Sequence, residues 1–561
     1  MARTVGIGIQ DFEKIIKENV FYVDKTHFIR EWWESKDDVT LIARPRRFGK
    51  TLNMSMLDRF FSNKYENQEE LFAGLSIWEE EVYRKLAGQY PVVSLTFAGV
   101  KDITYENAVY SICEIIMQLY NNYAFLAESE KLTEAERESV RKKMRNISEQ
   151  EAKTALHTLS ELLYKHYGKK VLIFLDEYDT PMQEAYVSGY WDEFTSFIRG
   201  LFNATFKTNP YLDKAVLTGI TRVSKESIFS DLNNLEVVTT TSDKYTTCFG
   251  FTEEEVFAAM DEQGMAGKEE VKRWYDGFTF GKVTDIYNPW SIINYLDKKK
   301  LGAYWANTSS NSLVGKLIRE GSPEIKITFE KLLNREIITK PIDEQIVYNR
   351  LDGNEEAIWS LLLATGYLKV ISYETDAKSL EEREPFYELK LTNEEVRIMF
   401  RQMVREWFKQ SDDKYNNFIK ALLADDEEAM NEFLQELCEI VFSSFDTGKN
   451  PSRKEPERFY HGLVLGLMVD MSEKYHIRSN RESGFGRYDV MIWPKEEGNA
   501  YIMEFKVKKK KEKDLKETVK AALKQIEEKD YEAELVALGF PRENIRKYGF
   551  AFEGKEVLIG S

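Results

Sequence analysis

Gly49, Lys50 and Thr51 close the stretch IARPRRFGKT, which begins at Ile42. In the pattern G-x-x-x-x-G-K-[ST], backbone amides face phosphate oxygens, the lysine reaches the β- and γ-phosphates, and the hydroxyl coordinates Mg²⁺. Arg44 stands here in place of the first glycine. The alternative is a G-K-T that occurs by chance in a basic turn. The residues predicted to contact ATP in this loop are Arg46, Arg47, Phe48, Gly49, Lys50 and Thr51.

A pair of carboxylates, Asp176 and Glu177, follows the apolar run VLIFL. Such a run is typical of a strand buried on both faces of a parallel sheet. At the end of this strand, Asp176 is expected to hold the Mg²⁺ of ATP together with Thr51, and Glu177 to act as general base on the attacking water. Asp179 adds a third acid, for a metal or a loop contact. A solvated acidic turn after a core strand is the alternative.

Two polar side chains lie on a further apolar run, KAVLTGITRVS at residues 214–224. Thr218 is placed to sense the γ-phosphate, and Arg222 to neutralise charge that develops in phosphoryl transfer. Both residues are therefore predicted to contact ATP, with simple capping and solvation of a strand end as the alternative.

Asp489, Glu504 and Lys506 form a second constellation, D…E-x-K, with 14 residues between the acids. Alternation in YIMEFKV places Glu504 and Lys506 on one face of a strand. The two carboxylates are predicted to bind Mg²⁺, or alternatively Mn²⁺, which would activate water for attack on a phosphodiester. Lys506 would position the water or stabilise charge in the transition state. Charged strands without metal chemistry are the alternative.

Strands and helices must position these groups. Residues 39–43 and 91–97 are predicted strands, and TLNMSMLDRFF after the loop is a predicted buried helix. Between the two constellations, residues 356–407 show the order helix, strand, strand, helix, which predicts a winged-helix-like unit. A helix over 457–471 is expected to precede the strands that carry the D…E-x-K residues.

With 43% hydrophobic residues, the composition is that of a globular protein. The length of 561 residues predicts three or more domains. The net charge of −17 argues against a wholly basic nucleic-acid coat. Residues 451–561 carry 22 Lys and Arg against 20 Asp and Glu, which leaves −19 on the preceding 450 residues. A nearly neutral C-terminal part is compatible with local contact to DNA.

The positions of the cysteines and the lengths of the apolar segments indicate in which cellular compartment the protein is expected. Cys113, Cys248 and Cys438 lie too far apart for a four-ligand zinc cluster or a disulfide framework, and the five histidines are scattered. Reduced and mostly buried thiols are expected. No apolar segment reaches about 18 residues, and the N-terminus has no secretory signal, so a soluble, cytoplasmic protein without membrane contact is predicted.

Several segments together resemble a known family. They are FYVDKTHFI, RPRRFGKTL, LDEYDTP, LTGITRVSKESIFSDLNN, WYDGF and YNPWSI, in this order. The chain resembles AAA-ATPase-like proteins whose C-terminus is similar to PD-(D/E)xK nucleases, and its ATPase part also resembles STAND-type ATPases. The resemblance implies that Asp24, Lys25 and Thr26 run near the nucleotide. It also implies an extra metal-binding acid at Glu457 and a nuclease-site glutamine at Gln525, and Gly484, Gly486 and Arg487 suit a close backbone approach to DNA.

The resulting expectation is an α/β protein. Its predicted domains are a P-loop core with a parallel sheet (1–250), a helical lid (251–330), a winged-helix-like connector (331–410), a helical linker (411–450) and a restriction-endonuclease-like α/β domain (451–561). ATP and nucleic acid, DNA in the first instance, are the predicted partners. A setting in defence or mobile-element biology and assembly into a homo-oligomer are left open. The alternatives are a STAND-like regulatory ATPase whose nuclease fold only binds nucleic acid, a nuclease with static nucleotide, and a winged-helix transcription regulator.

Overall fold

The computed structural model of the chain describes residues 2–221, 229, 232–306, 312–343, 357–374, 386–409, 412–445, 455–483 and 486–561. By its internal contacts the chain forms two compact units. The first comprises Met1–Ser309 and Thr339–Val396, and the second Ser310–Ile338 and Arg397–Ser561. Among the described residues, no helix combines the length and the apolar character needed to cross a bilayer.

A five-stranded sheet in the order β2-β3-β4-β1-β5 forms the centre of the first unit, and every neighbouring pair is parallel. The strands are β1 Val39–Ala43, β2 Val92–Thr96, β3 Val171–Asp176, β4 Leu212–Gly219 and β5 Leu235–Val238. All residues of β1 and β3 are buried, as their apolar sequences predict for strands covered on both faces.

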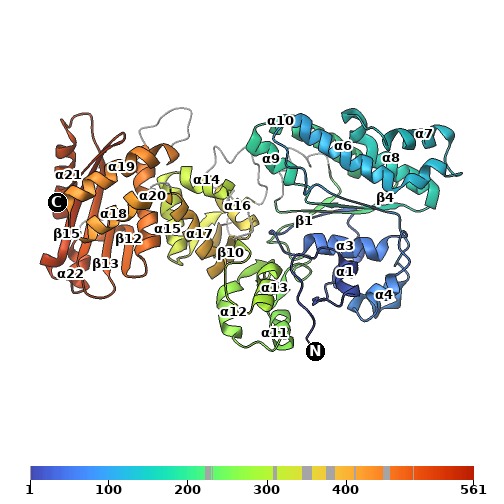
Figure 1. The fold of residues 1–561 in the computed structure, drawn as a ribbon, viewed down its shortest axis with the longest axis horizontal. Helices are drawn as coiled ribbons and strands as arrows, with labels where there is room; N and C mark the ends of the chain where they lie inside the picture. Colours follow the sequence, from blue (N-terminus) through green and yellow to red (C-terminus); the bar gives the residue numbers. More distant parts are fainter. Residues whose placement is uncertain are drawn as a thin grey trace. The chain divides into compact units, whose positions relative to one another are not determined.

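Helices cover both faces of this sheet. They are α1 Phe12–Lys17, α2 His27–Glu34, α3 Lys50–Phe61, α4 Gln68–Phe72, α5 Glu81–Arg84, α6 Tyr105–Asn122, α7 Glu134–Lys143, α8 Glu149–Tyr167, α9 Thr180–Ser188 and α10 Trp191–Phe202. Helices α6, α8 and α10 lie over one face, and α1, α3 and α4 over the other (Figure 1). The charged stretch between β2 and β3 thus forms sheet-covering helices, and two of them begin with capping boxes, at Thr133 and Ser148.

The segment predicted as a helical lid contains strands as well as helices. Its elements in the first unit are β6 Phe251–Thr252, α11 Glu253–Glu262, α12 Lys268–Tyr275, β7 Phe278–Phe280, β8 Val283–Tyr287 and α13 Pro289–Lys298. The strands pair antiparallel in the order β6-β8-β7. Tyr275 and Tyr287 are fully buried in the core of this module, and Trp274 packs against it. Tyr275 and Trp274 are therefore packing residues of this module.

The winged-helix-like order is present in α16 Ala357–Ala364, β10 Leu368–Glu374, β11 Phe386–Leu391 and α17 Glu394–Glu406. Strands β10 and β11 pair antiparallel, and β9 Ile338–Pro341 joins them in the order β10-β11-β9. The boundary between the two compact units falls within α17. The five-domain division stays a prediction.

A mixed five-stranded sheet, β12-β13-β14-β15-β16, forms the centre of the second unit, with β14 and β15 parallel and the other pairs antiparallel. Its strands are β12 Tyr475–Ser483, β13 Gly486–Pro494, β14 Ala500–Val507, β15 Ile545–Glu553 and β16 Glu556–Gly560. Its helices are α14 Ser312–Glu320, α15 Pro323–Leu333, α18 Asp412–Leu423, α19 Glu427–Phe445, α20 Glu455–Met471, α21 Leu515–Glu528 and α22 Ala533–Ala537. Helices α21 and α22 flank the sheet on one side, and α18, α19 and α20 on the other (Figure 1). The α/β fold class is confirmed in both units.

Candidate functional site

The loop from β1 to α3, which the sequence predicts to bind phosphate, contains two residues with positive φ. Gly49 has φ +81° and directly precedes α3, and Arg47 also has a positive φ, +67°. A non-glycine residue in this conformation is uncommon and is characteristic of functional loops. The amides of Lys50 and Thr51 donate to no acceptor in the described part of the chain. Free amides at a helix N-terminus form a site for anions.

Lys50 lies inside this loop. Its Nζ donates to the carbonyl oxygens of Arg44, at 2.8 Å, and Pro45, at 2.9 Å. Only 5% of the residue is exposed, and burial lowers its pKa while Glu177 and Asp176 act in the opposite direction. An ammonium held by two loop carbonyls has its donors already directed into the loop, where phosphate oxygens would replace these acceptors.

Asp176 is brought together with Thr51 and Thr218 by the strand order. Because β4 lies between β1 and β3, the ends of all three strands meet at one edge of the sheet. Thr51 donates its hydroxyl to Oδ2 of Asp176 at 2.7 Å, and Thr218 donates to Oδ1. Burial raises the pKa of Asp176, and the two hydroxyl donors oppose that shift. The three predicted residues therefore form one hydrogen-bonded cluster beside the loop.

Glu177 follows at the strand end in a left-handed conformation, with φ +51°. Thr180 donates to its carboxylate at 3.0 Å, and the carboxylate is half-buried. The next acid, Asp179, is 1% exposed and accepts the amides of Ile220, at 2.9 Å, and Thr221, at 3.0 Å. Of the two roles considered for Asp179, its hydrogen bonds correspond to the loop contact.

Arg44 does not point into open space. Its side chain is fully buried, donates to the carbonyl oxygens of Thr239 and, at 3.2 Å, Lys244, and lies 4.3 Å from the centroid of the Phe280 ring. Burial lowers its pKa to about 9. Since Arg44 is not among the described residues with positive φ, its backbone does not require glycine.

The other side chains of the loop contact the module that follows β5. Phe48 is buried against Phe278, with ring centroids 4.7 Å apart, and the Arg47 guanidinium lies 4.4 Å from the Trp290 ring centroid. Arg46 donates to Gln183 at 3.3 Å. Trp290 thus contacts the predicted nucleotide loop. The apolar character of this residue alone did not indicate such a contact. Lys25, expected near the nucleotide, instead pairs with Glu255 at 2.6 Å.

In the second unit, antiparallel pairing positions the acids of the D…E-x-K pattern. Val490 pairs with Met503, and continuing this register places Asp489 opposite Glu504 on the neighbouring strand. Asp489 Oδ2 accepts the amide of Phe505 at 2.8 Å. Alternation along β14 then places Lys506 on the face that carries Glu504, as predicted, and their charged atoms are 3.4 Å apart.

Gln525 of α21 completes this cluster. Lys506 donates to its Oε1 at 2.6 Å, and its amide nitrogen donates to Glu504 Oε1 and, at 2.9 Å, to the hydroxyl of Tyr531. Tyr531 was not predicted, because no local pattern links it to the strand. Glu504 is 2% exposed, and in the described part of the chain its buried Oε2 has no hydrogen-bond partner.

The electrostatics of Glu504 suit a cation ligand. Burial, and then the charge of Asp489, raise its pKa to about 8, while Lys506 acts in the opposite direction. A buried carboxylate oxygen without a donor, beside a second carboxylate, is a pair of hard oxygen ligands of the kind that divalent cations bind. The donor set therefore fits a divalent metal ion.

Some predicted residues lie outside what the structure describes. These are Arg222, Gly484 and the side chains of Glu457 and Arg487; the backbone positions of Glu457, Gly486 and Arg487 fall in α20 and β13. Lys508, in the basic run after β14, pairs with Glu553 at 2.8 Å, and residues 509–511 are exposed.

Comparisons with known proteins agree with this two-part arrangement. Residues 6–229 match the family model described as predicted AAA-ATPase, and residues 455–561 match that of the PD-(D/E)XK nuclease superfamily. The chain is also 24% identical to "Uncharacterized protein in vnfD 5'region" of Azotobacter chroococcum mcd 1, over 96% of this chain and 95% of that protein. The chain is therefore similar to the predicted AAA-ATPase family in its N-terminal part and to the PD-(D/E)XK nuclease superfamily in its C-terminal part.

Proposed function

We propose that this protein hydrolyses ATP in its N-terminal unit and cleaves nucleic acid, DNA in the first instance, in its C-terminal domain with a divalent metal ion. The observation that carries the proposal is the cluster of partly exposed Asp489, Lys506 and Gln525 around buried Glu504, whose Oε2 has no hydrogen-bond partner among the described residues. An unpaired buried acceptor destabilises the fold, and a bound cation would remove this cost. Coupling between the two activities is inferred from their presence in one chain.

At the N-terminal site, each predicted group has a distinct task. The amides of Lys50 and Thr51 and the Lys50 ammonium would bind phosphate oxygens. Thr51 and Asp176 would hold the Mg²⁺ that accompanies ATP, and Thr218 fixes the orientation of Asp176 through its hydroxyl. Glu177, at the same strand end, would accept a proton from the attacking water.

At the C-terminal site, Asp489 and Glu504 would hold Mg²⁺ or Mn²⁺. Such an ion polarises a phosphodiester and lowers the pKa of a bound water. Lys506 is held by Gln525 at 2.6 Å, and its remaining donors are available to orient a water or a phosphate oxygen. The exposed lysines at 509–511 follow directly on the strand that carries Glu504, which favours a polyanionic substrate.

A nuclease assay tests the C-terminal part. The full chain is incubated with DNA or RNA and Mg²⁺ or Mn²⁺, with and without ATP, and compared with Glu504→Ala and Lys506→Ala. Lys555→Ala and Glu556→Ala serve as matched controls, since both side chains are exposed on the β15–β16 hairpin. Metal-dependent cleavage that both site variants lose and both controls keep is expected. Binding without cleavage under all conditions would favour the regulatory ATPase instead.

Phosphate release tests the N-terminal part. Glu177→Gln should bind ATP but release little phosphate, and Glu193→Gln, an exposed substitution on α10, should behave as wild type. Absence of steady-state turnover in the wild type would contradict hydrolysis and leave the nucleotide as a static cofactor.

A further inference from the structure

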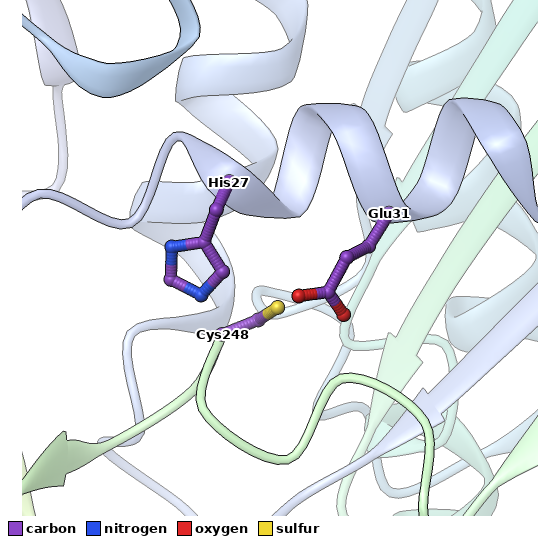
Figure 2. A group of neighbouring side chains, drawn as sticks. All are labelled: His27, Glu31 and Cys248. Carbon is purple, nitrogen blue, oxygen red and sulfur yellow. The ribbon is translucent and has the colours of Figure 1, made fainter.

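A third cluster of side chains lies apart from the residues assigned to ATP and to the nuclease site. His27 and Glu31 are on α2, and Cys248 lies in the segment that precedes β6. One ring nitrogen, one carboxylate oxygen and the sulfur all lie within 4.8 Å of one another. Figure 2 shows the imidazole and the carboxylate descending from the helix toward the thiol on the loop below. Three different ligand types therefore meet at one point.

The fold fixes both sides of this cluster. His27 and Glu31 are four residues apart, which places them on one face of α2. Between them, Phe28 packs edge-on against Tyr245, at 5.3 Å, and Phe249, at 5.0 Å between ring centroids. These contacts hold the segment that carries Cys248 against the helix.

The charges around the cluster suit a divalent cation. Cys248 as thiolate and Glu31 as carboxylate would supply two negative charges, and a neutral His27 none, so a bound divalent ion would be fully balanced. Two cations, Lys25 and Arg44, act on Cys248. The Lys25 ammonium is paired with Glu255 at 2.6 Å and bound to the carbonyl of Thr247 at 2.8 Å, and Arg44 donates to the carbonyl oxygens of Thr239 and Lys244. This charge balance is needed because Cys248 is fully buried, and an uncompensated charge in a buried position costs much free energy.

We propose that His27, Glu31 and Cys248 form a zinc-binding site. Nitrogen, sulfur and oxygen ligands are the set that Zn²⁺ prefers, and Mg²⁺ or Ca²⁺ would not select a thiolate. In a tetrahedral site with bonds of about 2.0–2.3 Å, ligand atoms lie about 3.4–3.8 Å apart, so closure from 4.8 Å requires a shift of about an ångström. A water completes the coordination, since His27 and Glu31 are partly exposed.

This zinc site is independent of the proposed ATPase and nuclease activities. It clips α2 to the segment before β6, two parts of the chain more than two hundred residues apart. The carbonyl oxygen of Cys248 also accepts a hydrogen bond from Asn53 at 2.9 Å, and Asn53 lies in α3, the helix that follows the phosphate loop. Bound zinc therefore stabilises the segment that contacts this helix.

Metal analysis of the full chain tests the proposal. The protein is loaded with an equimolar amount of zinc, passed over a desalting column and analysed by mass spectrometry for metal content. One zinc per chain is expected for the wild type and for Cys438→Ser, a matched control at another buried, free cysteine. Cys248→Ser and His27→Asn should retain less than about a tenth as much, because each loses one of three protein ligands.

Cobalt substitution separates this site from the acidic nuclease site, whose residues include no cysteine. A near-ultraviolet charge-transfer band from cobalt to thiolate is expected in the wild type and in Glu504→Ala, and is expected to be absent in Cys248→Ser. If Cys248→Ser does not fold, the same band is measured in His27→Asn and Glu31→Gln, because both substitutions alter partly exposed side chains.

Thermal unfolding supplies the third readout. Zinc at about a hundred times its Kd should raise the unfolding temperature of the wild type by about 3–6 °C and leave that of His27→Asn unchanged. A wild type that retains no zinc after loading, or a His27→Asn variant that retains it fully, overturns the proposal. The cluster is then a thiol hydrogen-bonded to a carboxylate.

Discussion

The proton on Glu504 should compete with the metal ion at the C-terminal site. Burial and the neighbouring Asp489 raise the pKa of Glu504 to about 8. A carboxylic acid with a raised pKa keeps its proton below that pH, and a metal ligand must release it. Metal affinity is therefore expected to rise with pH up to about 8 and then to level off.

The magnitude follows from the fraction of Glu504 that is ionised. With a pKa of about 8, this fraction is about 1% at pH 6, about 10% at pH 7 and half at pH 8. The apparent Kd for Mn²⁺ should therefore be about 100-fold weaker at pH 6 than at the plateau, and about tenfold weaker at pH 7.

The assay is Mn²⁺ binding to the full chain without nucleotide or DNA, followed by electron paramagnetic resonance of the free ion from pH 6 to 8.5. Lys506→Met is the informative variant. Because Lys506 lowers the pKa of Glu504, its removal should move the whole profile to higher pH. Glu504→Gln should bind weakly, with little dependence on pH. A wild-type affinity that stays constant between pH 6 and 8, or a profile that moves to lower pH in Lys506→Met, would refute the reasoning.

Four further substitutions have defined outcomes. Lys50→Ala removes the ammonium that is proposed to bind phosphate oxygens. If it makes two charge-assisted hydrogen bonds of about 1.5 kcal/mol each to ATP, its loss should weaken ATP binding about 100-fold, measured by calorimetry. Glu177→Gln should keep ATP binding and lose about 10²–10⁴ in kcat, measured by phosphate release. Arg44→Gly leaves two carbonyls without their donor and should lower the stability of the first unit by about 3 kcal/mol without raising turnover, followed by denaturant unfolding and ATPase assays. The protonated Glu504 stabilises the metal-free C-terminal domain fully below the unfolded-state pKa of about 4.5, and this stability is lost as the pH rises through about 8. Glu504→Gln carries no charge at any pH, so it should raise the unfolding temperature of the domain at pH 8.5, measured by calorimetry.

Local patterns predicted the strands well. The apolar runs at 39–43 and 171–175 became β1 and β3 with at most one residue of difference, because a strand buried on both faces needs an unbroken apolar sequence. The three-stranded sheet within residues 251–287 was missed, although FTFGKVTDIY alternates around a Gly-Lys turn. The short β5 carried too few residues to stand out from the loops around it.

Long-range partners were not predictable from spacing. No local sequence pattern indicates that Lys25 pairs with Glu255 or that His27 lies beside Cys248, because each contact joins segments more than two hundred residues apart. The sequence excluded a zinc cluster built from cysteines, and the three cysteines are indeed free and buried. A mixed site with one cysteine falls outside that exclusion.

Arg44 shows how the predicted phosphate loop is ordered without a glycine at its first position. Glycine is favoured where φ is positive or where a Cβ would collide. In this loop the positive φ values belong to Arg47 and Gly49, not to Arg44. The Arg44 side chain extends away from the loop interior to the carbonyls of Thr239 and Lys244, while its own carbonyl accepts a hydrogen bond from Lys50. The arginine thus anchors the loop to the segment after β5 through its side chain, and its backbone carbonyl accepts a hydrogen bond from Lys50. Glycine at this position would free the backbone and remove the anchor, so the loop of this chain depends on arginine for the order that a phosphate site needs.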